Sequence, residues 1–235
     1  MGRYSGIAAI IAGLWLWAGT AAAEPVDVGA MAQVQRTVYG VPPQGNQSVK
    51  REGDTVVFQE ELETVDGSAA LIRFIDDSTL ALGAKSKVLI DAFVFDPEKA
   101  EGNALIRISV GTLRFVTGEM PKGKTVIKTP TATLVLRGTK VLVRVHPDGT
   151  TDTTVEEGSV DGHNDITNDE ANIPSGEGQT FGHGGNSDFS GGDDFSGPGT
   201  GGGGDSNPPE HRRSNDSEPE SSEPAGGGGG FGPSN

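Results

Sequence analysis

The segment of this sequence that most closely fits a reactive motif is Gly118–Thr125, which reads Gly-Glu-Met-Pro-Lys-Gly-Lys-Thr. It matches the phosphate-binding pattern G-x-x-x-x-G-K-[ST]. That loop binds phosphate only where a strand precedes it and a helix follows it. A strand over residues 112–117 is expected, but residues 126–129 are strand-like and Pro130 prevents a helix. The sequence therefore predicts a hairpin loop here and no nucleotide site.

Paired carboxylates are the second candidate for chemistry, because two such groups can act as general acid and base. The densest pairs in the body of the chain are Asp76-Asp77 and Glu156-Glu157. We expect the first pair in a turn and the second at a strand edge, where charges discourage aggregation. No G-x-S-x-G nucleophile motif occurs. The sequence predicts that the protein is not an enzyme, and a carboxylate-dependent hydrolase is the minor alternative.

Metal and cofactor chemistry has little support in the sequence. There is no cysteine, which excludes disulfides, thiolate zinc sites and iron–sulfur clusters. The four histidines lack the spacing of a metal-binding pair: His146, His163, His183 and His211. Residues 184–190 and 191–197 resemble each other and the calcium-binding G-G-x-G-x-D repeat, but their spacing is about seven residues and not nine. A solvated spacer is the preferred interpretation, and the G-x-G-x-x-G match at Gly197–Gly202 has no strand before it. No cofactor or metal is expected.

Short strands are expected to position the residues of the body. Apolar and polar residues alternate along it, which is the period of a half-buried strand. Turn signals such as Asp66-Gly67, Pro147-Asp148-Gly149 and Asp161-Gly162 fall between these runs. Helix is expected at most as single turns at residues 60–63 and 97–102. Leu136 is expected in the core. The pattern predicts an all-β barrel, sandwich or solenoid without choosing among them.

The two ends of the chain differ from this body. Residues 1–23 carry one basic residue near their start, Arg3, followed by an apolar run, and end with Ala21-Ala22-Ala23. This pattern predicts a cleaved export signal. An uncleaved membrane anchor is the alternative. Residues 175–235 are rich in Gly, Ser, Asp and Pro, which predicts a disordered, flexible tail. The expected organisation is a signal peptide over 1–23, one β domain over 24–174 and the tail over 175–235.

The formal net charge of the chain is −15, and both the body and the tail are acidic. An acidic surface makes nucleic acid and anionic lipid headgroups poor partners. We therefore expect no nucleic-acid partner, and membrane contact only if the signal is uncleaved.

One block of residues resembles a known family. Residues 128–141, KTPTATLVLRGTKV, resemble the TP-x-A-x-x-x-x-RGT core of the FecR domain family, and Gly158 and Val160 resemble its later G-x-V rung. Residues 66–71 and 76–80 are similar to its earlier rungs. The resemblance covers roughly Val56 to Phe181 and implies a β-solenoid-like stack of short strands. The candidate structural or binding residues that it marks are Thr129, Pro130, Arg137, Gly138, Thr139, Gly158 and Val160.

The best-known FecR-family members are regulators with a cytoplasmic segment that acts on a sigma factor. Here only Met1–Gly6 precede the apolar run, so direct sigma-factor contact is not expected. The resemblance implies a non-enzymatic binding or sensing module in the bacterial cell envelope, located in the periplasm or at the cell surface. An envelope protein or a surface glycan is the expected partner. The alternative is a structural or adhesive surface protein that uses the tail as a display arm.

Overall fold

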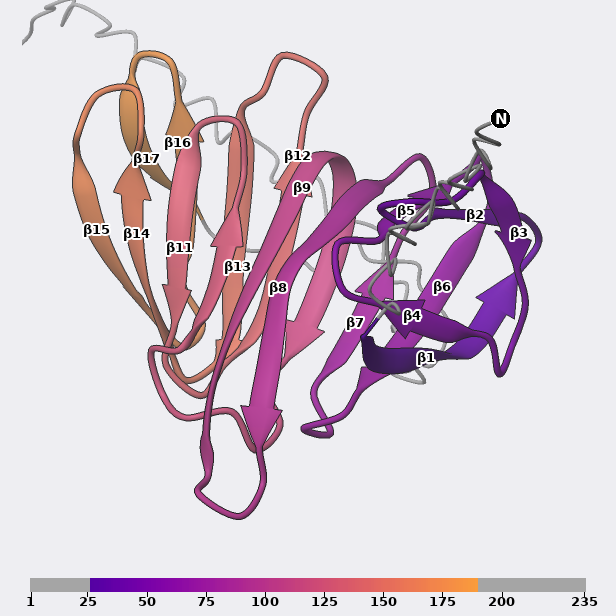
Figure 1. The fold of residues 1–235 in the computed structure, drawn as a ribbon. Coiled ribbons are helices and arrows are strands. Elements are labelled where there is room, and N and C mark those ends of the chain that lie inside the picture. Colours follow the sequence, from indigo (N-terminus) through magenta and orange to yellow (C-terminus); the bar gives the residue numbers. More distant parts are fainter. Residues whose placement is uncertain (1–25, 190–235) are drawn as a thin grey trace, which may run out of the picture. The chain divides into compact units, whose positions relative to one another are not determined.

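The structure is a computed structural model that describes residues 26–189. This part of the chain folds into 17 strands and contains no helix (Figure 1), so the all-β prediction is confirmed. None of its elements is a helix long and apolar enough to cross a membrane. The predicted export signal lies outside the described residues.

The strands form two sheets that face each other. In sheet A the strands lie side by side in the order β4–β1–β6–β7–β9–β12–β13–β16–β17. Their bounds are β1 Asp27–Gln35, β4 Thr55–Val57, β6 Ala69–Phe74, β7 Thr79–Leu82, β9 Glu101–Val116, β12 Lys140–Val145, β13 Thr151–Glu157, β16 Gly178–Gly182 and β17 Gly185–Phe189.

In sheet B the order is β3–β2–β5–β8–β9–β10–β11–β14–β15. The strands that belong to it alone are β2 Val38–Val41, β3 Ser48–Lys50, β5 Glu61–Thr64, β8 Lys87–Asp96, β10 Thr125–Lys128, β11 Ala132–Leu136, β14 Ser159–Asn164 and β15 Glu170–Pro174.

Strand β9 belongs to both sheets. Residues 101–110 pair with β8 in sheet B, and residues 111–116 pair with β7 and β12 in sheet A. The chain passes between the sheets at Gly111, which has a φ of 101°. A Cβ at Gly111 would lie 2.4 Å from the Cα of Ser86. Glycine is therefore required both by the backbone angle and by the neighbouring chain.

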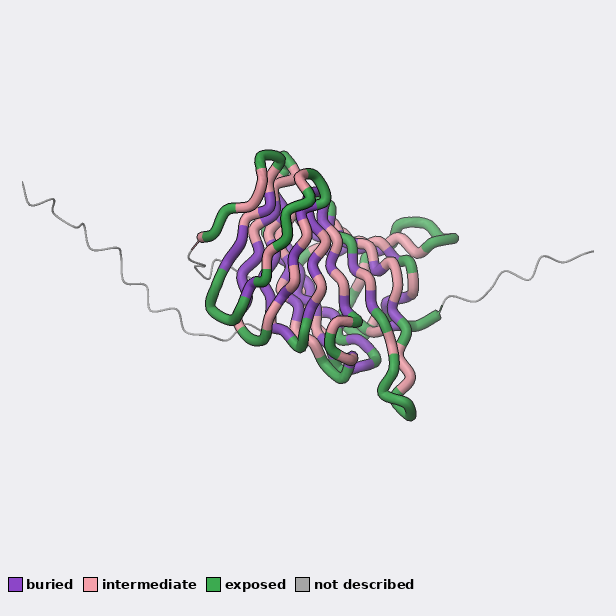
Figure 2. Tube along the Cα trace, turned by 90° about the vertical axis from the view of Figure 1, so that its left-hand side faces the viewer, coloured by how far each residue is buried: buried purple, intermediate pink, exposed green. Residues whose placement is uncertain are grey.

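The core lies between the two sheets. Buried positions alternate with less buried ones along most strands, as the tube in Figure 2 shows. Leu134 and Leu136 of β11 and Val141 and Val143 of β12 are almost completely buried. Leu136 is only 1% exposed, so its predicted place in the core is confirmed.

Most neighbouring strands are antiparallel. The one parallel pairing between described strands joins β9 and β10. The solenoid-like stack implied by the family resemblance is not confirmed by this pairing and stays a prediction. Neither of the two segments expected as single helical turns is helical. Residues 61–64 form strand β5, and residues 97–100 form a turn between β8 and β9.

The loop that contains the phosphate-binding pattern is not the expected hairpin. Because β10 runs parallel to the first half of β9, a hairpin cannot join them. The loop instead carries the chain from the sheet A end of β9 back to sheet B. Strand β10 follows it directly, as predicted from Pro130. A Cβ at Gly118 would lie 2.1 Å from the carbonyl oxygen of Asp76, so this glycine allows the loop to pack on the β6–β7 turn.

The ordered fold continues past the predicted start of the tail at Ser175. Strands β16 and β17 lie within that segment, and Phe181 in β16 is fully buried. The first calcium-like repeat forms β17, which pairs antiparallel with β16. Composition alone concealed this hairpin, because glycines at 178, 182 and 185 outweigh its two phenylalanines. The rest of the predicted tail, residues 190–235, and the Gly197–Gly202 match lie outside the described residues.

Candidate functional site

The family motif residues Arg137, Gly138 and Thr139 form the passage from β11 in sheet B to β12 in sheet A. The Thr139 Oγ1 accepts a hydrogen bond from the Arg137 N–H at 3.0 Å and donates one to the Ser159 carbonyl oxygen at 2.9 Å. Gly138 has a φ of 68°, in the left-handed region that favours glycine. This part of the motif therefore shapes a crossing between the sheets.

Gly158 forms the next crossing, from β13 to β14, with a φ of 82°. A Cβ at this position would lie 2.3 Å from the Gly138 carbonyl oxygen. The two glycine crossings are thus stacked against each other. Val160, two residues further on, is completely buried in the core. Both residues of the G-x-V rung have structural roles.

This stacking predicts that Gly158→Ala destabilises the protein more than Gly138→Ala does. Gly138→Ala is expected to lower the free energy of unfolding by about 1–2 kcal/mol, because it forces an alanine into the left-handed region. Its nearest neighbour would be the Lys122 side chain at 3.4 Å. Gly158→Ala meets the same backbone penalty and a clash with main chain, so it should cost more. Urea unfolding of both variants measures the difference, and equal losses would contradict the stacked arrangement.

Thr129 and Pro130 lie at the other end of β11, in the turn after β10. The Thr129 Oγ1 accepts hydrogen bonds from the Ala132 N–H at 2.9 Å and the Thr151 hydroxyl at 2.8 Å. Pro130 is exposed in the turn. The structure therefore places the motif residues at both ends of β11 and does not bring them together into one site.

The candidate catalytic carboxylates form hydrogen bonds and ion pairs within the protein. Asp76 is buried and accepts hydrogen bonds from the N–H and hydroxyl of Ser78, at 2.9 and 2.6 Å. Asp77 forms an exposed ion pair with Arg73. On the outer face of sheet A, Glu156 makes a two-bond ion pair with Arg114, and Glu157 pairs with Lys140. The two acidic pairs thus contribute to turns and cross-strand contacts in different parts of the fold.

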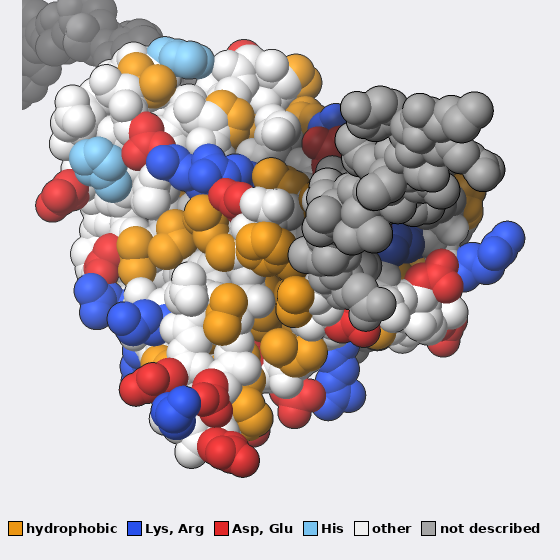
Figure 3. Space-filling model, viewed as in Figure 1, with side chains coloured by type: hydrophobic (Ala, Val, Ile, Leu, Met, Phe, Trp, Pro, Cys, Tyr) orange, Lys and Arg blue, Asp and Glu red, His pale blue; other side chains and the backbone are white. Residues whose placement is uncertain are grey.

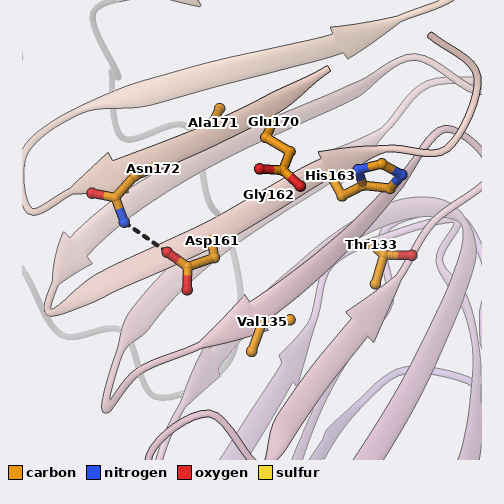
Figure 4. A pocket seen from close by; sticks show the side chains of 8 residues that line it. All are labelled: Thr133, Val135, Asp161, Gly162, His163, Glu170, Ala171 and Asn172. Atoms are coloured by element: carbon orange, nitrogen blue, oxygen red, sulfur yellow. Dashed lines mark hydrogen bonds between the residues drawn. The ribbon is translucent and has the colours of Figure 1, made fainter. Parts of the chain in front are cut away.

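A groove lies on the outer face of sheet B, over β11, β14 and β15. Its volume is about 450 Å³, within the range of about 300–1,000 Å³ that small-ligand sites occupy. Figure 4 shows the side chains that line it, and in Figure 3 this face carries apolar side chains in its middle, between acidic and basic ones. The lining residues are Thr133, Val135, Asp161, Gly162, His163, Glu170, Ala171 and Asn172.

Strand register explains the shape of this groove. Thr133, His163 and Glu170 are directly opposed on the three strands, and Val135, Asp161 and Asn172 are opposed two residues away. Successive strand residues point to opposite faces, so the two sets form two outward rows. Between them, Gly162 and Ala171 present mainly backbone outward. A Cβ at Gly162 would lie 2.3 Å from the Phe181 ring on the core side. The groove is the trough between the rows.

The row of Val135, Asp161 and Asn172 is held by a polar network. The Arg137 Nε donates to Asp161 Oδ2, and the Asn172 Nδ2 donates to Asp161 Oδ1 at 2.7 Å. These two hydrogen bonds lower the pKa of the Asp161 carboxyl below its usual value, and the bond from Arg137 has the larger effect. Arg137 is thus a surface cation that is paired with an acid, and it fixes the Asp161 side chain beside the groove.

The lowered pKa predicts a pH effect. The contribution of the pair to stability is present above the unfolded-state pKa of aspartate and is lost as the pH falls through the lower folded-state pKa. It should be at most about 1 kcal/mol, because both side chains are partly exposed. In an NMR titration, Arg137→Ala should shift the Asp161 pKa upward towards 3.8, its ordinary value. An unchanged pKa would exclude Arg137 as its main cause.

The groove was not predicted from the sequence. Arg137, which borders it, was marked by the family motif, and His163 was named only as lacking the spacing of a metal pair. Asp161-Gly162 was expected as a turn, but both residues lie within strand β14. The alternation in β11 predicts which of its residues point outward, but not which strands are its neighbours. The described residues contain no group of three or more His, Asp or Glu side chains arranged to hold a metal ion.

The fold and site define a two-sheet β domain with a polar surface groove and structurally engaged acidic pairs. Residues 60–161 match the model of the family described as FecR protein. The predicted resemblance is thereby confirmed, over a shorter range than expected, from Glu60 just before β5 into β14.

Comparison with solved structures found two crystal structures of a protein named "putative anti-sigma factor" from Parabacteroides distasonis ATCC 8503. The identities are 15% and 14%, with TM-scores of 0.46 and 0.45. Each match covers 55% of this chain and 59% of the other, so this chain spans less than two thirds of that protein. A search of curated proteins found no match.

Proposed function

We propose that this protein is an exported, non-enzymatic binding and sensing module of the bacterial cell envelope. The observation that carries the proposal is the FecR domain at residues 60–161. The groove begins within that domain, at Thr133, Val135 and Asp161, and is completed by β15, which lies beyond the match. The groove is the binding surface in this proposal.

A binding role is supported by the way the acidic residues are used. Asp76, Asp77, Glu156 and Glu157 each have a local hydrogen-bond or ion-pair partner. A general acid or base has to contact the substrate, whereas in each acidic pair both carboxylates are engaged in contacts within the protein. The groove, by contrast, presents several polar side chains that can hydrogen-bond to a ligand.

Export is supported by the sequence of residues 1–23, with its apolar run and small-residue cleavage pattern. The absence of cysteine fits an exported domain that is held by burial and backbone pairing. A sensing role requires a partner, and an envelope protein or a surface glycan is the partner proposed here.

Protease accessibility on intact cells tests this proposal. A tag inserted at Gly229 of the full chain is followed by fractionation, and the mature mass is recorded. Cleavage only after the outer membrane is opened supports a periplasmic sensor, particularly if crosslinking retains an inner-membrane protein. Cleavage on whole cells favours the structural or adhesive alternative at the surface. A tag that is protected until the cytoplasm is opened, with the uncleaved mass, would overturn the export proposal.

A further inference from the structure

The groove on sheet B has two side chains that the rest of the fold does not use. His163 and Glu170 are directly opposed on β14 and β15 and project from the same face. Neither side chain makes a hydrogen bond or ion pair with another described residue. Side chains at such opposed positions have Cβ atoms about 4.5–5.5 Å apart, so a single small ligand can contact both.

Across the trough, the opposite row is prearranged by contacts within the protein. Asn172 is oriented by its hydrogen bond to Asp161, and Asp161 is held by Arg137. This fixed row lowers the conformational entropy that a ligand would have to remove on binding. The groove thus combines one rigid polar wall with a second wall in which His163 and Glu170 are unengaged, while the Thr133 hydroxyl donates to Asp165 at 3.0 Å.

The hydrogen-bonding types in the groove are mixed. Glu170, Asp161 and Thr133 offer acceptors, since the Thr133 hydroxyl hydrogen is donated to Asp165, whereas His163 and Asn172 can each both donate and accept. Sugar hydroxyl groups also donate and accept at the same atom. A ligand with several neighbouring hydroxyls therefore matches this lining better than one that only donates or only accepts.

Charge and hydrogen-bonding capacity argue against two other ligand classes. Recognition of a phosphate or carboxylate relies on cationic donors, but no lysine or arginine lines the groove, and the nearby Arg137 is paired with Asp161. The apolar lining consists of Val135 and Ala171. An apolar ligand would cover His163 and Glu170 without giving them hydrogen-bond partners, which costs free energy.

We propose that this groove binds a neutral saccharide, with His163 and Glu170 as its principal contacts. The three strands are about 4.8 Å apart, so the trough is about 10 Å long and accommodates two linked sugar rings. This inference rests on the proposed binding function and specifies its ligand. It identifies the ligand by chemistry, as an uncharged polyhydroxylated chain.

Calorimetric titration of the full chain with neutral oligosaccharides tests the inference. The probes are maltotriose, cellotriose, chitotriose and mannotriose. We expect saturable binding of at least one, weakened about tenfold by His163→Ala and by Glu170→Gln, since losing one hydrogen bond of about 1.4 kcal/mol changes affinity tenfold. The matched controls are His183→Ala and Glu177→Gln, which lie outside the groove and should leave affinity unchanged.

One further probe, tetralysine, and the trisaccharides themselves give the outcomes that would contradict the inference. Binding of tetralysine alone, lost in Glu170→Gln, would overturn the saccharide ligand and indicate a cationic peptide. Failure of all four trisaccharides up to millimolar concentration, or equal weakening by the control variants, would also overturn it. None of these results affects the location and crosslinking tests of the proposed function. Because the groove residues lie on a sheet surface, an unchanged thermal midpoint verifies that the variants are folded.

Discussion

Replacement of Lys50 by methionine is expected to lower the free energy of unfolding by about 3–5 kcal/mol, the usual cost of leaving one member of a buried ion pair without its partner. Glu60 is completely buried, and its Oε1 lies 2.6 Å from the Lys50 Nζ. The contact is an ion pair rather than a well-aligned hydrogen bond. The other carboxylate oxygen accepts the Val57 N–H at 3.0 Å. Without Lys50, a buried charge would remain with a single hydrogen bond.

The double variant Lys50→Met, Glu60→Gln is the control for this result. It removes both charges, so it should recover most of the lost stability, because paired replacement of buried ions is often nearly neutral. Arg73→Met removes one member of the exposed Arg73–Asp77 pair and should cost under about 1 kcal/mol. Urea unfolding measures all three. A loss at Lys50 no larger than that at Arg73 would show that the Glu60 charge is accessible to water.

The Lys50–Glu60 pair was not predictable from the sequence alone. Alternation correctly predicts that the residues around Leu136 form a strand with one buried face, whereas it does not predict strand β5 around Leu62. It does not reveal that β3 lies next to β2, or that Glu60, just before β5, turns inward to meet Lys50. A Cβ at Gly40 of β2 would lie 2.4 Å from the Glu60 Oε1. The space for this pair therefore depends on a glycine in a third segment of the chain.

The same limit applies to the groove. The period of two predicts that Thr133 and Val135 share a face, whereas Asp161-Gly162 was expected as a turn and not as part of strand β14. The groove exists because β11 pairs with β14, although the hairpin of β12 and β13 lies between them in the sequence. The family motif, in contrast, was recognisable because its glycines and threonine satisfy local backbone demands. Local demands leave a signature in the sequence, whereas contacts between distant strands do not.

Phe181→Ala is expected to destabilise the protein by about 3–5 kcal/mol, as large aromatic truncations in a core do. The ring is completely buried and packs across the core against Gly162 of sheet B. On the other side of the sheet, the backbone of Gly162 forms part of the groove floor. Loss of the ring should therefore leave a cavity directly beneath the groove, between β14 and β16. The expected result would establish that the hairpin of β16 and β17 belongs to the folded domain.

Phe189→Ala provides the matched control, because Phe189 is a phenylalanine of the same hairpin that is only partly buried. A Cβ at Gly178 would lie 2.8 Å from its ring, which shows that this ring covers the opposing glycine on the strand surface. Its removal uncovers surface without opening a core cavity, so the loss should be clearly smaller. If both variants lost equally little in urea unfolding, the sequence-based boundary at Ser175 would be the correct end of the domain. A large loss of unfolding free energy for Phe181→Ala alone places the end of the domain beyond β16, because only a residue packed in the core between the two sheets contributes so much stability.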